Sequence, residues 1–552
     1  MIDLTHLVAR FYRFGHTNIR ILMVVDSSIR TVEAPGAFGI GRVVRLIDNY
    51  SRGCSSFSVD TARREPFVGD NSQNQGHIST DFRFNDLDGD GNRIIDSYDQ
   101  IWMFGFRGEG SGPVVSAAEL GQLTDWMNKG GGVFATGDHD DLGASMCSGI
   151  PRVREMRRWT ASQQVPPIGG FNRLDTNRPT NTAEATGASP IAFAHERDTT
   201  PQPIEWVPVS VQHVGVFSYE FPHETLCHPA LGPIDVMPDH PHEGRTREVS
   251  EMNTTRTYNF TGGISGDDFP SSGGHRPLPQ VIAYGETAPA PPTNKPYKGN
   301  CGYFRFPMIS VYDGRDAGVQ GRVATDSTWH HWFDLNIYEL EHAADDTAWR
   351  KIACYFQNLA VWLSPPGRFR EKCWFIHQWL EYPLVEELDI RNFDVRRINP
   401  DLGVIVRDRF RQVFGPCATR RFAWDNLCEL APRICRGLER FEPRFPPFPD
   451  GPIPDPICLT CPPPEIIENA IFEGVMLSTI EFMQKHVDRA EELAKLSDVR
   501  LERELNRFMA PGVHAAVQGL GKRILKDLDK DQRMWAKVVD ARPGGRRRPR
   551  RR

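Results

Sequence analysis

Histidine and acidic side chains gather in three short clusters of this 552-residue chain. The first cluster spans residues 138–141 (DHDD), the second spans 239–243 (DHPHE), and the third spans 326–331 (DSTWHH). Imidazole and carboxylate groups bind divalent metals and move protons near neutral pH. The first and third clusters each follow an apolar, strand-like run, and open α/β sheets place their ligands at strand ends. The sequence therefore predicts one polar site assembled from distant segments.

Metal binding is the chemistry that these clusters favour. A catalytic zinc-type site commonly uses three protein ligands and keeps one position open. Adjacent histidines in an extended chain point in opposite directions, so we expect only one of the pair in the third cluster to face the site. The candidate ligands of a divalent transition metal such as zinc are His139, His240, His242, and one of His330 and His331. The candidate catalytic residues are Asp138, His139, Glu243 and His330, with Asp138 or Glu243 as the general base.

Two other interpretations of the histidines remain open. Each histidine could be held by a neighbouring carboxylate in a hydrogen-bonded polar core, or the histidines could be scattered over the surface. Cys147 lies close to the first cluster, but a small buried residue is a simpler interpretation than a nucleophile.

A second candidate site is the acidic loop, whose carboxylates alternate with other residues before a glycine. Such a loop can surround a hard cation such as calcium with oxygen atoms. Its candidate ligands are Asp86, Asp88, Asp90 and Asp96. The spacing departs from that of an EF-hand, because the twelfth position counted from Asp86 is Ser97. A polar turn between strands is the competing interpretation, since Asp and Gly are also common turn residues.

Alternating strand and helix patterns predict the elements that position these clusters. Apolar runs predict strands at 20–28, 100–105, 133–136, 279–284, 306–312 and 321–325. Helix-like periodicity predicts three helices. The first covers 38–50, the second begins at the capping-box pair Ser116 and Glu119, and the third covers 345–363. This order predicts an α/β fold with a mostly parallel sheet covered on both faces, and with long insertions at about 160–280 that carry the second cluster.

Two motifs give this arrangement a family resemblance. They are the run 130–137 (GGGVFATG), which leads into the first cluster, and Gly321-Arg322-Val323, which leads to His330. Over about residues 15–365 the chain resembles the class I glutamine amidotransferase-like superfamily, especially its ThuA-like, flavodoxin-like branch. The resemblance implies a flavodoxin-like sheet and hints at a sugar derivative as substrate. The family's Gly-x-Cys-x-Gly nucleophile elbow is replaced here by 137–141 (GDHDD), which argues against glutamine hydrolysis through a thioester.

Composition and segment boundaries give the remaining expectations. We expect an α/β domain over 1–365, a mixed and mostly helical region over 366–441, a proline-rich linker over 442–464, a helical region over 465–540 and a basic tail over 541–552. An apolar stripe from Ile466 to Ile480 must be buried, either within the chain or in a homo-oligomer. The arginine-rich tail could contact a polyanion. Eleven scattered cysteines and no membrane-spanning or signal segment predict a cytoplasmic protein.

The function that we expect is metal-assisted hydrolysis of a small-molecule substrate. The alternative is a non-catalytic binding or assembly protein, in which the sheet domain is a scaffold and the C-terminal helices recruit partners. The missing cysteine elbow and the large C-terminal region favour that alternative.

Overall fold

The computed structural model describes residues 17–160, 201–238 and 244–365, together with parts of the C-terminal region. Short gaps lie at 27, 35–36, 53–54, 140, 215–216, 272–275, 287–304 and 318–319, and the C-terminal region is described at 464–486 and in parts of 403–427 and 507–522. The chain divides into two compact units. One contains 4–210 and 221–378, and the other contains 1–3, 211–220 and 379–552.

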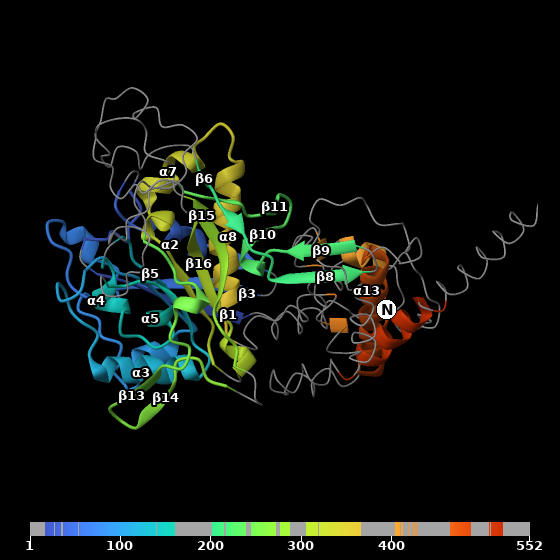
Figure 1. Ribbon diagram of the computed structural model, residues 1–552, viewed down its shortest axis with the longest axis horizontal. Coiled ribbons are helices and arrows are strands. Elements are labelled where there is room, and N and C mark those ends of the chain that lie inside the picture. The colour runs from blue at the N-terminus through green and yellow to red at the C-terminus, as the bar shows by residue number, and fades with distance from the viewer. Residues whose placement is uncertain are drawn as a thin grey trace, which may run out of the picture. The chain divides into compact units, whose positions relative to one another are not determined.

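A nine-stranded sheet forms the centre of the first unit (Figure 1). Its order is β2-β3-β1-β4-β5-β17-β16-β15-β7. The five strands β3, β1, β4, β5 and β17 are parallel, whereas β2 at one edge and β16, β15 and β7 at the other are antiparallel to their neighbours. The strand bounds are β2 Ser51–Arg52, β3 Ser55–Arg63, β1 Thr17–Val25, β4 Gln100–Phe104, β5 Gly132–Thr136, β17 Val323–Asp326, β16 Arg305–Tyr312, β15 Gln280–Glu286 and β7 Glu205–Trp206.

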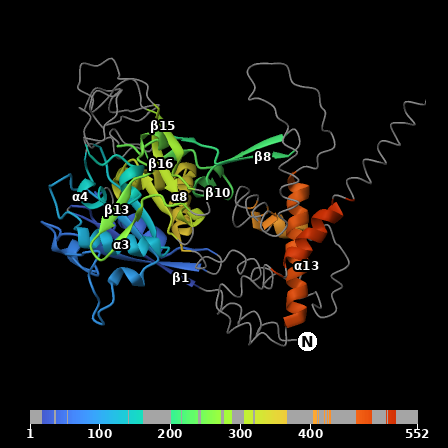
Figure 2. The same ribbon diagram turned by 60° about the horizontal axis from the view of Figure 1, so that its bottom comes forward.

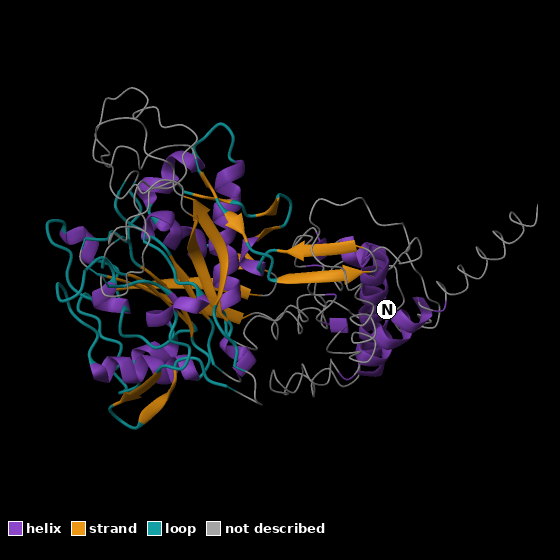
Figure 3. Ribbon diagram, in the orientation of Figure 1, coloured by secondary structure: helices purple, strands orange, loops and turns teal. Residues whose placement is uncertain are grey.

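Helices cover both faces of this sheet (Figure 3). Successive strand residues point to opposite faces, and β1 shows the consequence. Ile21 and Met23 are buried in one core with side chains of α2 (Gly41–Asp48), α7 (Asp334–Glu341) and α8 (Thr347–Leu363). Leu22 and Val24 are buried in the other core with side chains of α3 (Ala117–Asn128), α4 (Ala144–Cys147) and α5 (Val153–Met156). The predicted α/β class, with a sheet covered on both faces, is confirmed.

The predicted elements agree with these bounds to within a few residues, and the helix start at Ser116 is confirmed in atomic detail. The Ser116 hydroxyl accepts a hydrogen bond from the backbone N–H of Glu119, and the Glu119 carboxylate accepts one from the backbone N–H of Ser116. Strand β3 has no counterpart among the predicted strands. Its alternating sequence SSFSVDTAR has few apolar residues, because only part of the strand is buried.

The long insertion between β5 and β17 contains short antiparallel pairs. These are β6 (Gln202–Pro203) with β12 (Val236–Met237), β10 (Cys227–His228) with β11 (Gly232–Pro233), β13 (Thr257–Phe260) with β14 (Ile264–Asp267), and β8 (Ser210–Val214) with β9 (Phe217–Phe221). The hairpin β13–β14 lies beside α3 in both views (Figures 1 and 2). The insertion also supplies the antiparallel strands β15 and β16.

The second unit contains α13 (Pro464–His486), which includes the whole predicted apolar stripe from Ile466 to Ile480. Ile467, Ile471 and Ile480 are buried, whereas Ile466 is exposed. Gly474 packs closely against Gly512. Phe410 contacts Phe472, and these two residues stand before and after the proline-rich segment in the sequence. Much of the stripe is therefore buried within the chain. Among the helices that the structure describes, none is long and apolar enough to cross a membrane.

Candidate functional site

The first and third clusters meet at the carboxyl edge of the sheet. Strands β5 and β17 are parallel neighbours, so residues that follow them leave on the same side. The last backbone pair of the two strands is Thr136 with Asp326. Beyond it, the backbone N–H of Trp329 still donates a hydrogen bond of 2.8 Å to the Gly137 carbonyl. The structure thus brings together two clusters that are nearly two hundred residues apart in the sequence, as the site prediction requires.

Asp138 lies at the centre of this junction, and its side chain is fully buried. One carboxylate oxygen accepts a hydrogen bond of 2.8 Å from the Thr328 hydroxyl. The other lies 2.6 Å from Nδ1 of His139 and 4.0 Å from Nε2 of His330. The His139 side chain is 13% exposed, so the ring that Asp138 orients also reaches the surface. A carboxylate bonded to Nδ1 favours the tautomer whose Nε2 carries the lone pair.

His330 is held in a similar way by an amide oxygen. It belongs to the 3-10 turn η8 (Trp329–Trp332), whose N-cap residue Thr328 accepts a hydrogen bond from the His330 N–H. Nδ1 of His330 lies 2.8 Å from Oδ1 of Asn336, which can only accept. The proton is therefore placed on Nδ1, and Nε2 presents its lone pair toward Asp138. The aromatic rings of Trp329, Phe333 and Phe38 surround this imidazole.

His331 does not join this group, although it is the neighbour of His330. Its Nδ1 lies 2.7 Å from the Asp326 carboxylate, and its Nε2 lies 3.0 Å from the amide nitrogen of Gln202. The indole N–H of Trp332 donates to the other oxygen of Asp326 at 3.0 Å. His331, Asp326 and Trp332 are fully buried and form a hydrogen-bonded polar core, so only one member of the histidine pair faces Asp138.

The second cluster, with His240, His242 and Glu243, lies outside the described residues, but the residues that flank it are described. On one side, the carbonyl of Pro238 accepts a hydrogen bond of 3.0 Å from the Gln202 amide that also faces His331. On the other side, Gly244 packs so closely that an added Cβ would lie 2.6 Å from the Asp138 carbonyl and 2.9 Å from that of Ser327. Gly244 therefore lies against the first and third clusters, and Pro238 is connected to the third cluster through Gln202.

A carboxylate at the end of β1 belongs to the same sheet edge. Asp26 is buried and accepts hydrogen bonds from the backbone N–H groups of Phe106 and Arg107, at 2.6 and 3.1 Å. Burial raises the pKa of Asp26 to about 6, even though these hydrogen bonds favour the ionised form. Cys147 is also fully buried, and burial raises the pKa of its thiol. A buried thiol with a raised pKa is a poor nucleophile, which agrees with the simpler interpretation of this cysteine.

The acidic loop forms a hydrogen-bonded turn. One oxygen of Asp88 accepts from the N–H groups of Asp90 and Asn92, both at 2.9 Å, and these bonds lower the pKa of Asp88. Asp86 accepts from the Arg83 N–H at 2.7 Å, and Asp96 forms a two-fold ion pair with Arg93. Within the described residues, no group of three or more His, Cys, Asp or Glu side chains is arranged to hold a metal ion.

Three residues at the junction were not predicted from the sequence: Thr328, Asn336 and Arg157. The first two lie within six residues of His330, so a search for hydrogen-bonding neighbours around each candidate ligand could have found them. Arg157 gave no such signal, because its guanidinium joins the two clusters by donating to the backbone carbonyl groups of Asp138, Asp326 and Ser327, and every residue has a backbone carbonyl. Comparison with protein-family models, curated proteins and solved structures finds no match to this chain, so the geometry of the site carries the functional argument.

Proposed function

We propose that this protein is a metal-assisted hydrolase whose site lies at the carboxyl edge of a flavodoxin-like, glutamine amidotransferase-like domain. The order of the five parallel strands supports the fold assignment. Numbered along the chain, they lie in the order 2-1-3-4-5, which is the order of flavodoxin-like sheets. The resemblance to ThuA-like proteins favours a sugar derivative as the substrate, by analogy of fold alone.

The observation that carries the proposal is the paired orientation of His139 and His330. Each ring has Nδ1 held by an oxygen acceptor, Asp138 for the first and Asn336 for the second. Metal-binding histidines are held in this way in proteins, since the hydrogen bond at one ring nitrogen fixes the tautomer and directs the other nitrogen to the metal. Both rings also lie within 4.0 Å of the same oxygen of Asp138.

The donor set suits a metal of the zinc type. Zinc bonds to imidazole nitrogen and carboxylate oxygen are about 2.0–2.2 Å long, so donors at a tetrahedral centre are roughly 3.4 Å apart. Nε2 of His330 lies 4.0 Å from the Asp138 oxygen that holds Nδ1 of His139, so the two rings lie close to one carboxylate. We propose that His139 and His330 are two ligands and that His240 or His242 supplies the third.

The roles of the acids follow from their surroundings. A bound metal would lower the pKa of a coordinated water from 15.7 to about 7. Asp138 is buried and accepts hydrogen bonds through both oxygens, which suits it to orient His139 better than to remove a proton. We therefore propose Glu243 as the general base. The buried thiols of Cys147 and Cys354, neither of which forms a disulfide, support the cytoplasmic location that we propose.

The start of α2 argues against a phosphate-bearing cofactor of the flavodoxin kind. In such folds, the N-terminus of the helix after the first strand commonly binds a phosphate group. Here the Asp334 carboxylate accepts a hydrogen bond of 2.8 Å from the Arg42 N–H in the first turn of α2, and one of 3.2 Å from the Ala34 N–H. The carboxyl group of Asp334 thus satisfies backbone donors that a phosphate would otherwise use.

Metal analysis of the protein purified without added metal tests the proposal. We expect about one equivalent of transition metal in the wild type and a large loss in His139→Ala and in His330→Ala. His342→Ala is the matched control, because His342 is exposed and bonds only to the Tyr338 carbonyl in its own helix. Wild-type protein without transition metal would contradict the proposal and favour the non-catalytic alternative.

A further inference from the structure

We propose that Arg157 is a positioning residue that sets the distance between the first and third clusters. Its side chain is fully buried. Nη2 donates to the carbonyl groups of Asp138 and Ser327, both at 2.7 Å, and Nε donates to the Asp326 carbonyl at 2.8 Å. One guanidinium thus binds the chain that follows β5 and the chain that follows β17.

These contacts begin where the sheet ends. Backbone pairing of β5 with β17 stops at Thr136 and Asp326, and the residues that carry chemistry come after that point. Asp138 and Ser327 direct their carbonyl groups to the same nitrogen, so Arg157 extends the connection between the two strands into the site. Arginine suits this role because its planar group presents five donors in a fixed geometry, whereas the lysine ammonium presents a single nitrogen.

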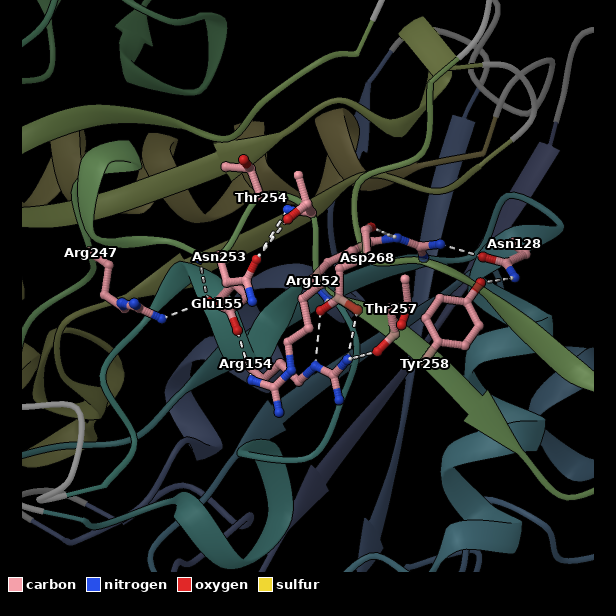
Figure 4. A network of polar contacts seen from close by, with 12 residues as sticks. Asn128, Arg152, Arg154, Glu155, Arg247, Asn253, Thr254, Thr257, Tyr258 and Asp268 are labelled. Carbon is pink, nitrogen blue, oxygen red and sulfur yellow. Dashed lines mark hydrogen bonds and ion pairs between the residues drawn. The ribbon is translucent and has the colours of Figure 1, made fainter.

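The segment around Arg157 is itself held firmly. The guanidinium lies over the Trp159 ring, 4.6 Å from its centroid, and Nη1 donates to the Arg158 carbonyl at 2.7 Å. Just before it, the side chain and backbone of Arg152 bind Asp268, and Arg154 forms a two-fold ion pair with the same residue (Figure 4). The base of Arg157 is therefore fixed independently of the clusters that it connects.

This role predicts an effect on metal affinity, and to that extent it rests on the proposed function. Residues that orient metal ligands without touching the metal typically change affinity by 10- to 100-fold when they are replaced. Arg157→Lys keeps the positive charge but cannot reach all the carbonyl groups that Arg157 binds. We therefore expect Co²⁺ to bind Arg157→Lys at least tenfold more weakly than the wild type.

A second readout needs no metal. The backbone N–H of Trp329 donates directly to the Gly137 carbonyl and so connects the ends of β5 and β17. Hydrogen exchange at this amide therefore reports whether the two strand ends stay together. In metal-free protein we expect exchange at Trp329 to be at least tenfold faster in Arg157→Lys. Arg63→Lys is the matched control: Arg63 is equally buried, and its guanidinium also donates to backbone carbonyl groups, those of Gln73 and Ile29, which belong to neither the first nor the third cluster. It should leave the Co²⁺ affinity and the Trp329 exchange near their wild-type values.

Gly244→Ala tests the same junction if Arg157→Lys does not fold. An added Cβ would lie 2.5 Å from Nη2 of Arg157, so this substitution should also speed exchange at Trp329. Unchanged affinity and exchange in Arg157→Lys would overturn the inference, as would equal losses in Arg63→Lys. If the wild type binds no Co²⁺, the proposed function fails, and exchange at Trp329 alone decides the role of Arg157.

Discussion

Asp138→Asn isolates the orienting role of the central carboxylate at almost unchanged volume. The wild-type side chain accepts from the Thr328 hydroxyl at 2.8 Å and from His139 Nδ1 at 2.6 Å. An asparagine has one oxygen and one NH2 group, so only one of the two contacts can keep its acceptor. The Thr328 hydroxyl can also accept a hydrogen bond, whereas Nδ1–H of His139 requires an acceptor. We expect the amide to direct its oxygen to Nδ1 of His139 and its NH2 group to the Thr328 hydroxyl, so that His139 keeps an acceptor but loses the negative charge beside it.

The size of the effect follows from the charge that the acceptor of the His139 hydrogen bond loses. A hydrogen bond to a charged group contributes about 1.5–3 kcal/mol, and about 1.4 kcal/mol corresponds to a tenfold change in an equilibrium constant. If His139 instead changes tautomer, its proton moves to Nε2 and blocks the nitrogen that we propose as the metal donor. Both routes weaken metal binding. We therefore expect Asp138→Asn to lower Co²⁺ affinity by about 10- to 100-fold.

The assay is a competition titration with Co²⁺ on chelator-treated protein, with urea unfolding of the metal-free protein alongside. Asp141→Asn is the matched control. Asp141 belongs to the same turn but accepts from the Glu109 N–H at 2.9 Å, a bond that the asparagine oxygen can keep. Its Co²⁺ affinity should stay within about twofold of the wild type, because a single neutral acceptor is retained. Equal affinities of Asp138→Asn and the wild type would refute the reasoning.

Two further predictions concern acidic residues other than Asp138 and Asp141. Burial raises the pKa of Asp334 from 3.8 to about 7. The stability that its protonated form contributes is therefore complete below about pH 4 and is lost as pH rises through 7, so the free energy of unfolding falls by up to about 4 kcal/mol. Asp334→Asn should remove this decline in urea unfolding between about pH 4 and 8; the same decline in wild type and variant would contradict the pKa assignment. In the acidic loop, millimolar calcium should raise the melting temperature of chelator-treated protein, and Asp88→Ala with Asp90→Ala should abolish the rise. An unchanged wild-type midpoint would leave the loop as a hydrogen-bonded turn.

The sheet and its helices could be predicted because local signals agree with the fold. Apolar runs such as 133–136 are buried on both sides in the structure, and the capping box at Ser116 forms both of its hydrogen bonds. The antiparallel direction of β15 and β16 was not predicted, since it depends on how the long insertion returns to the sheet. Strand β3 escaped prediction because partial burial leaves its sequence rich in polar residues.

Part of the site could also be predicted, since parallel neighbouring strands end on the same side of a sheet. This property of parallel sheets predicts that the first cluster, with Asp138, and the third, with His330, meet. It could not decide between His330 and His331, because the turn η8 and the buried Asp326 carboxylate determine which ring faces which acid. It also missed Arg157, because backbone carbonyl groups are present at every residue and leave no mark in the sequence.

The most direct test of the central claim is a crystal structure of the Co²⁺-treated protein with anomalous data collected at the cobalt edge. The proposal predicts one strong peak within bonding distance of Nε2 of both His139 and His330, about 2.0–2.2 Å from each. It also predicts that Nδ1 of each ring keeps the acceptor seen here, Asp138 and Asn336 respectively. An ordered junction without an anomalous peak between the two imidazole rings would contradict the claim and leave a hydrogen-bonded polar core.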